Sequence, residues 1–269
     1  MISVLRISIV ALMALAASVL STSTHAQASA AEIGVVVMHG KGGSPDKHVD
    51  KLAEALEKAG FQVANLEMPW SGRRQYDVDM AGAVNEISAA LDAMRAKGAK
   101  KFFVAGHSQG GLNTLHYGSQ QTVDGLIAIA PGGSHGARDF ATALGSHVST
   151  AKSMIDEGRG SEKAVFADYE GSKGAYSITT TAAIYFDWFN PAGPHNMWDV
   201  VKKVKSGVPV LYVAPTRDYP SLKSQKHASF SALPSHPLTR LYEPESDHLR
   251  APAAAAGEIV LWINQVAGR

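Results

Sequence analysis

Gly106-His107-Ser108-Gln109-Gly110 is the stretch that decides the fold prediction, because it sets a serine between two glycines where a strand meets a helix. Residues 101–105 before it form a largely apolar run typical of a buried strand, and a helical pattern begins at Gly111. The glycines remove side chains that would collide with the neighbouring strand and helix. The pattern predicts a strained turn that presents the Ser108 hydroxyl above the sheet, beside a helix N-terminus that favours negative charge.

The same alternation of strand and helix runs outward from this turn in both directions. Amphipathic helical patterns are expected at 49–60, 80–98 and 255–266. The fold class is therefore α/β, a mostly parallel sheet flanked by helices. Six core strands are predicted from the apolar runs 33–38, 61–66, 101–105, 125–130, 208–214 and 239–242.

The alternation of strand and helix patterns is interrupted between Ser134 and Ser206, where Gly, Ser and Thr are frequent. A structureless loop of this length is uncommon inside a compact domain, so a small helical cap insertion at about 134–206 is predicted over the sheet edge. The aromatic cluster between Tyr185 and Phe189 is expected to form the packed underside of this cap rather than a substrate box.

The first residues indicate export. Arg6 precedes an apolar stretch at 7–20, and small residues follow through Ala26-Gln27-Ala28, which is the pattern of a signal peptide at 1–28. An uncleaved anchor is the alternative, but a membrane span needs roughly 18 apolar residues. We expect a domain of residues 29–269 in the periplasm or outside the cell, without stable membrane insertion. With no cysteine, it has neither disulfides nor a lipid-modified cysteine.

Composition excludes several partners. The chain carries 25 Lys and Arg against 24 Asp and Glu, with no basic run, so nucleic acid is not an expected partner. His, Asp and Glu show no metal-ligand spacing, and the glycine-rich segment at 39–43 does not match a phosphate loop. We therefore expect no metal and no cofactor. The oligomeric state is not indicated.

The serine motif, together with His39-Gly40 after an early strand, resembles the α/β-hydrolase superfamily over most of residues 29–269. The resemblance implies the chain order Ser, Asp, His, with the acid after the next-to-last strand and the histidine after the last. Asp218 and His248 stand at those positions. A triad of Ser108, His248 and Asp218 is thus predicted, with Asp187 and Asp247 as alternatives for the acid.

Two backbone N–H groups are expected to form the oxyanion hole of such a site. One belongs to Gln109, directly after the serine. The other comes from the loop at 39–43, and the resemblance to relatives with a His-Gly turn implies Lys41. His39 is expected to support this loop rather than to react.

The loop that begins at Met68 follows the second strand, at the sheet edge where ligands bind in open α/β folds. Two interpretations stay open. Trp70 lines the substrate pocket and Arg73, or Arg74, meets an anionic substrate group. Alternatively, the arginines are solvated and Trp70 packs under the cap.

The leading functional hypothesis is hydrolysis of a small-molecule carboxylic ester through an acyl-enzyme, because a serine hydroxyl needs an adjacent base to attack a carbonyl. Amide, peptide or thioester hydrolysis uses the same triad. A non-catalytic exported binding protein that keeps the fold is a further alternative. A true lipase would need a broad apolar face on the cap, which the polar segment 134–206 does not indicate.

Overall fold

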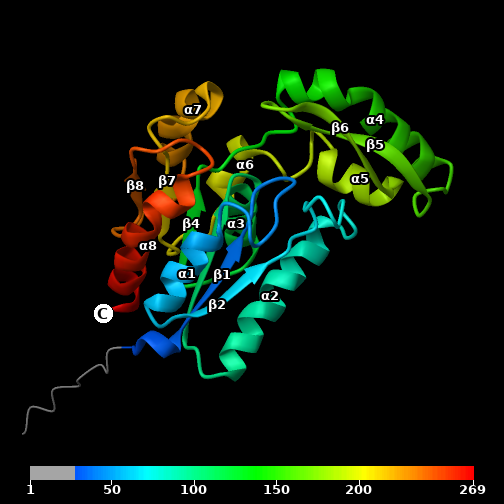
Figure 1. The fold of residues 1–269 in the computed structure, drawn as a ribbon. Coiled ribbons are helices and arrows are strands. Elements are labelled where there is room, and N and C mark those ends of the chain that lie inside the picture. Colours follow the sequence, from blue (N-terminus) through cyan, green and yellow to red (C-terminus); the bar gives the residue numbers. More distant parts are fainter. Residues whose placement is uncertain (1–27) are drawn as a thin grey trace, which may run out of the picture.

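The computed structural model describes residues 28–269, so the predicted signal peptide lies outside the described residues apart from Ala28. Its centre is a six-stranded parallel sheet in the order β2-β1-β3-β4-β7-β8 (Figure 1). The predicted α/β class is confirmed. The strands are β1 (Ile33–Met38), β2 (Gln62–Leu66), β3 (Lys101–His107), β4 (Gly125–Ile129), β7 (Val210–Val213) and β8 (Arg240–Tyr242).

The central strands are buried on both faces, which explains their continuous apolar sequence. All six residues of β1 are buried, and its side chains alternate between two hydrophobic clusters. Val36 and Met38 enter one cluster, whereas Val35 and Val37 enter the other. The core therefore lies in two layers, one on each side of the sheet.

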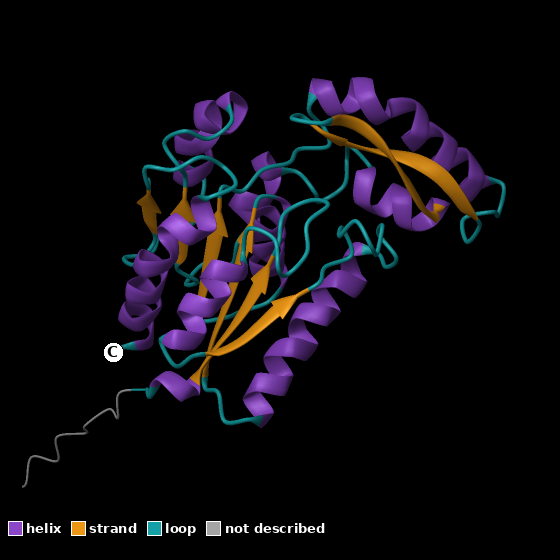
Figure 2. Cartoon of the chain, in the orientation of Figure 1, coloured by secondary structure: helices purple, strands orange, loops and turns teal. Residues whose placement is uncertain are grey.

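Helices cover both faces of the sheet (Figure 2). On one face α1 (Asp50–Lys58) packs against α8 (Ala251–Ala267), with Leu52 and Trp262 in their shared cluster. The opposite face is covered by α2 (Met80–Ala96), α3 (Gln109–Gln120) and α6 (Met197–Lys203). A short 3-10 helix, η1 (Ala30–Glu32), precedes β1, and α7 (Pro220–Ser231) follows β7.

A separate lobe is inserted after β4 and lies at the upper right of Figure 1. It contains α4 (Arg138–Asp156), the antiparallel hairpin of β5 (Lys163–Glu170) and β6 (Gly174–Thr181), and α5 (Ala182–Phe189). We call this lobe the cap. An antiparallel bridge between Ser134 and Asn196 joins its two ends, and α6 beyond it packs on α3. The sequence did not indicate the hairpin.

The aromatic residues of α5 form the interior of the cap. Tyr185, Trp188 and Phe189 are buried, and Tyr185 stacks between Phe166 of β5 and Phe189 with ring centroids 4.3 and 4.5 Å apart. The cluster is thus packed, as expected. In the part of the chain described, 28–269, every helix is too short or too polar to cross a bilayer.

Candidate active site

Ser108 lies on a strained turn between β3 and α3. Its backbone has φ 55° and ψ −115°, a conformation that side-chain-bearing residues rarely adopt. A Cβ on Gly106 would lie 2.2 Å from the carbonyl oxygen of Gly110, and one on Gly110 would lie 2.7 Å from that of His39. Only glycine fits at these two positions, so the sequence pattern forces this geometry.

The side chains of Ser108, His248 and Asp218 form a chain of hydrogen bonds. The Ser108 Oγ lies 3.0 Å from His248 Nε2, and His248 Nδ1 lies 2.7 Å from Asp218 Oδ1. Because the carboxylate accepts at Nδ1, the ring proton of neutral His248 is assigned there, which leaves Nε2 free to accept from the serine. His248 and Asp218 are both buried. The structure thus brings together the three residues that the sequence singled out.

Neither alternative acid forms a hydrogen bond with the His248 ring. Asp247 accepts a hydrogen bond from the backbone N–H of Arg250 at 2.9 Å, although it is the sequence neighbour of the histidine. Asp187 lies on α5 and accepts from the backbone N–H of Met80 at 2.8 Å. Asp218 also accepts from the N–H of Tyr219 at 2.7 Å, which fixes its carboxylate in place.

His107, the neighbour of the serine, supports the loop that carries His248. Its Nε2 donates to the backbone carbonyl of His248 at 2.9 Å, and the two rings lie 4.8 Å apart. Burial lowers the pKa of His107 to about 3, so the ring is neutral at physiological pH. Sequence reasoning did not give this residue a role, because its partner lies 141 positions away.

The loop after β1 lies directly beside the serine. A Cβ on Gly40 would come within 3.2 Å of the Ser108 Cβ. His39 holds the loop from beneath, since its Nδ1 bonds the Gly40 carbonyl at 2.7 Å and its Nε2 accepts from the Met68 N–H at 3.0 Å. Within residues 28–269, the backbone N–H groups of Lys41 and Gln109 donate to no protein acceptor. Both are free to bind an anion.

A cavity of about 780 Å³ opens onto Ser108 and His248, within the size range of small-molecule sites. Its floor includes Lys41 and Gln109, and the cap contributes Phe140 and Tyr169 to its walls. In residues 28–269, no group of three His, Asp or Glu side chains is arranged to hold a metal ion.

Two cap histidines, His135 and His195, also line this cavity. Both are buried, and burial lowers both pKa values, that of His135 to about 3. The His135 Nδ1 donates to the Trp188 carbonyl at 2.7 Å, and the His195 Nε2 lies 3.1 Å from the side-chain nitrogen of Asn113 on α3. These neutral rings are polar features of the cavity that no sequence motif signals.

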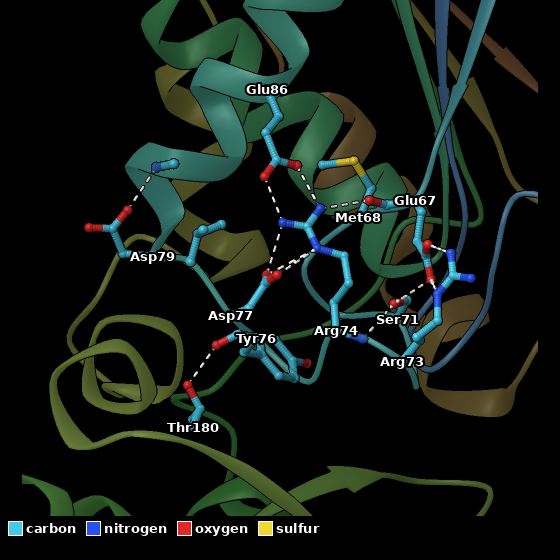
Figure 3. Close-up of polar contacts among 12 residues, drawn as sticks. Glu67, Met68, Ser71, Arg73, Arg74, Tyr76, Asp77, Asp79, Glu86 and Thr180 are labelled. Carbon is cyan, nitrogen blue, oxygen red and sulfur yellow. Dashed lines mark hydrogen bonds and ion pairs between the residues drawn. The ribbon is translucent and has the colours of Figure 1, made fainter. Parts of the chain in front are cut away.

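The loop at 68–74 does not reach the cavity, so the interpretation of Trp70 and Arg73 as pocket residues is wrong. Trp70 is buried, donates to the His39 carbonyl at 2.9 Å and packs edge-on against Trp188 of the cap. Arg73 is largely exposed and pairs with Glu67 (Figure 3). The alternative interpretation, with Trp70 under the cap, describes the structure.

Arg74 is likewise occupied within the protein. It makes two hydrogen bonds to Glu86 of α2, at 2.6 and 2.7 Å, and further bonds to Asp77 and to the carbonyl of Glu67 (Figure 3). This network anchors the loop to α2. It leaves the guanidinium committed to carboxylates rather than to a substrate anion.

Comparison with known families gives a match to the family model described as serine aminopeptidase, S33, over residues 29–165. No curated protein matches the chain. Solved structures match over most of their length but at low identity. A monoacylglycerol lipase from Paleococcus ferrophilus shares 20% identity with a TM-score of 0.60, covering 87% of this chain and 94% of that one.

A structure from a study of two metagenome-derived lipolytic enzymes gives 19% identity and a TM-score of 0.59, with coverage of 87% and 94%. An α/β hydrolase from Penicillium sp. gives 14% identity and a TM-score of 0.65, with coverage of 88% and 91%. At these identities the likeness concerns the fold. It supports the layered sheet and helices described above.

Proposed function

Because the chain belongs to the serine aminopeptidase S33 family of α/β hydrolases, we propose that it is a serine hydrolase that cleaves a carboxylic ester of a small molecule through an acyl-enzyme. The observation that carries the proposal is the pair of contacts at the cavity floor, 3.0 Å from Ser108 Oγ to His248 Nε2 and 2.7 Å from His248 Nδ1 to Asp218. These contacts have the geometry that an activated serine requires.

The first half-reaction forms the acyl-enzyme. Ser108 Oγ attacks the ester carbonyl while His248 Nε2 takes the hydroxyl proton, and the Asp218 carboxylate stabilises the resulting imidazolium. The carbonyl oxygen becomes an oxyanion held by the N–H groups of Lys41 and Gln109. His248 then protonates the departing alcohol as the bond from carbonyl carbon to alkoxy oxygen breaks.

The second half-reaction releases the acid. Water loses a proton to His248 Nε2 and attacks the acyl carbonyl, and the proton passes to Ser108 Oγ as it leaves. The Lys41 and Gln109 N–H groups bind the second oxyanion in the same way. No external reactant other than water is needed.

Ester chemistry is supported by the similar structures, one of which is a monoacylglycerol lipase and another of which comes from a study of two lipolytic enzymes. The walls of the cavity add an independent argument. Phe140, Tyr169 and Leu222 offer apolar surface around the serine, which suits the acyl or alcohol part of an ester.

Amide hydrolysis is the second candidate, because the matching family model is described as a serine aminopeptidase. An aminopeptidase must bind the α-ammonium group of its substrate. Asp139 and Glu170 line the cavity and carry the required negative charge, although Glu170 is already paired with Lys173 at 2.8 Å.

A panel of p-nitrophenyl esters and aminoacyl p-nitroanilides, assayed on wild type and Ser108→Ala, tests the proposal. We expect Ser108-dependent turnover of esters that exceeds turnover of anilides. A preference for anilides would assign the protein to the second candidate. Absence of Ser108-dependent turnover of either class would contradict both.

Export is a further part of the proposal, and it rests on the sequence pattern at residues 1–28. Expression of the full chain in a bacterial host, followed by fractionation and intact-mass measurement, tests it. We expect a periplasmic or secreted product shortened to begin near residue 29. A full-length product retained in the cytoplasm would contradict export.

A further inference from the structure

A fully buried carboxylate of the cap, Asp168 on β5, is the meeting point of four hydrogen-bond donors. Its Oδ1 accepts from Lys41 Nζ at 2.6 Å and from the Tyr169 N–H at 2.7 Å. Its Oδ2 accepts from the hydroxyls of Tyr76 and Tyr176, each at 2.8 Å. The carboxylate is saturated with donors and is compensated by one cation, as a buried charge must be.

Two series of side-chain contacts run from Asp168, and we call each of them an arm. The first arm leads to the loop beside the serine. Lys41 is largely buried, and its Nζ also donates to the Tyr169 carbonyl at 3.1 Å. The ammonium lies 5.3 and 5.7 Å from the ring centroids of Phe140 and Phe189, so two cap aromatics enclose it. The side chain of Lys41 is therefore fixed in the cap. Its backbone belongs to the loop beside Ser108, where the N–H of the next residue, Gly42, donates to the Trp70 carbonyl at 2.9 Å.

The second arm leads to the residue after the serine. Tyr76 donates its proton to Asp168, which leaves its oxygen free to accept from Gln109 Nε2 at 3.3 Å. Burial raises the pKa of Tyr76, and the Asp168 charge raises it further, so the hydroxyl keeps this proton. Gln109 itself is buried.

The two arms end at the two residues whose N–H groups face a developing oxyanion in the proposed mechanism. We infer that Asp168 is a positioning residue that fixes Lys41 and Gln109 together, so that the cap completes the oxyanion hole. This inference rests on the proposed function. Asp168 touches no substrate in this scheme; it acts through the lysine ammonium on one side and the Tyr76 hydroxyl on the other.

A positioning role makes a specific kinetic prediction, because the oxyanion exists only in the transition state and the tetrahedral intermediates. Displacing its donors weakens transition-state binding but leaves ground-state binding intact. A small misplacement of such groups costs up to about a hundredfold in rate. Loss of Asp168 should therefore lower kcat and leave KM nearly unchanged.

The test is Asp168→Asn, compared with Asp187→Asn as the matched control. Asp187 is another cap carboxylate, more exposed than Asp168, that accepts a hydrogen bond from the backbone N–H of Met80 but has no contact leading to the oxyanion loop. We expect kcat on the best p-nitrophenyl ester to fall roughly 10- to 100-fold in Asp168→Asn, with KM within about threefold, and no such change in the control.

The Ki of a phenylboronic acid distinguishes a positioning role from a purely structural one, because only the positioning role predicts that it changes. Its tetrahedral adduct on Ser108 sets an oxygen in the oxyanion hole, so its Ki should rise in parallel with the fall in kcat for Asp168→Asn. Equal kcat and equal Ki in folded Asp168→Asn and wild type would overturn the inference.

A second pair of variants covers the case in which Asp168→Asn does not fold. Tyr76→Phe and Tyr176→Phe each remove one hydroxyl from the same carboxylate oxygen, but only Tyr76 continues to Gln109. We expect kcat to fall several-fold in Tyr76→Phe and to stay near wild type in Tyr176→Phe. Equal effects in the two variants would overturn the Gln109 arm.

Failure of this inference and failure of the proposed function look different. If wild type turns over esters with dependence on Ser108 but the Asp168 and Tyr76 variants match it, the positioning role fails alone. If wild type itself has no Ser108-dependent activity, the proposed function fails, and the inference falls with it.

Discussion

The carboxyl edge of the sheet and the cap hold their polar groups by different means. At the sheet edge, backbone geometry holds Ser108: φ is 55°, and a Cβ on Gly106 would come within 2.2 Å of the Gly110 carbonyl. In the cap, a network of side chains surrounds Asp168, with four donors between 2.6 and 2.8 Å. The position of Ser108 therefore depends on neighbouring residues that have no side chain, whereas the position of Asp168 depends on the side chains that surround it.

The two regions should therefore tolerate different substitutions. A methyl group added to Gly106 or Gly110 in the Ser108 turn meets backbone atoms, which have nowhere to move. A methyl group added on an open face of the cap meets nothing, but a removed polar partner leaves a buried charge or donor unsatisfied.

His248→Gln removes the base that contacts Ser108 Oγ at 3.0 Å. We expect kcat on an ester to fall by about 10⁴-fold or more, because a serine without a base is a poor nucleophile. Steady-state assay with matched circular dichroism spectra checks it. Asp247→Asn changes the adjacent residue, whose carboxylate bonds the backbone N–H and pairs with the guanidinium of Arg250, and it should retain most of the activity. Similar losses in both variants would point to damage to the loop rather than to loss of a base.

Gly106→Ala adds a methyl group at the Ser108 turn, and Gly145→Ala adds one in the cap. The first should destabilise the fold by about 4 kcal/mol or more, since its Cβ would overlap the Gly110 carbonyl. The second lies within α4, meets nothing within 4 Å, and should stabilise by about 0.5 to 1 kcal/mol. Urea unfolding measures both. Equal free energies of unfolding for the two variants would refute the contrast.

Stability should fall on acidification because buried neutral histidines occur in both regions. Burial lowers the pKa of His107, next to Ser108, and that of His135, in the cap, to about 3 each, against about 6.5 in the unfolded chain. The unfolded chain then binds protons that the folded chain does not. The stabilisation that follows from keeping these two rings neutral is fully present above pH 6.5, and it is lost as the pH falls from 6.5 towards 3.

His135→Asn isolates the share of the cap in this acid sensitivity. The amide of asparagine is a neutral donor for the Trp188 carbonyl and does not titrate, so the variant should lose less stability than wild type between pH 6.5 and pH 4. Thermal unfolding across this range, referenced to pH 7.5 for each protein, measures the difference. Parallel pH curves for the two proteins would contradict the assignment.

Arg73→Ala and Arg74→Ala should give the smallest effects, and they separate the two arginines. Arg73 is largely exposed, so its replacement should change stability by less than about 0.5 kcal/mol and leave KM unchanged. Arg74 bonds Glu86 and Asp77 at a partly buried site, and its loss should cost about 1 to 2 kcal/mol. A clear rise in KM for anionic esters in Arg73→Ala would restore its predicted role in substrate binding.

The sheet could be predicted from the sequence because the relevant signals are local. The β1 residues form one unbroken apolar run, and they are buried without exception. The serine turn follows from two glycines within five residues, since no other residue fits their contacts. Asp218 and His248 needed the order implied by a family resemblance, because nothing in their own neighbourhoods distinguishes them from Asp247 or Asp187.

The sequence indicated an insertion at the cap but not its hairpin, because the structure of the cap depends on distant partners. In β5 the exposed Val165 and the buried Asp168 break the alternation of polar and apolar residues, and in β6 Ile178 is the one buried apolar residue, so no strand pattern stands out. The Lys41–Asp168 pair joins residues 127 positions apart. The sequence left two interpretations of Trp70 open for a related reason: position at the sheet edge does not say whether a side chain faces the cavity or, as here, packs against Trp188.

Labelling with a fluorophosphonate, followed by peptide mass spectrometry, tests most directly the claim that Ser108 is an activated nucleophile. We expect one adduct, on Ser108, that is absent from Ser108→Ala and forms far more slowly in His248→Gln. Folded wild-type protein that takes no label, or that carries it on another residue, would contradict it.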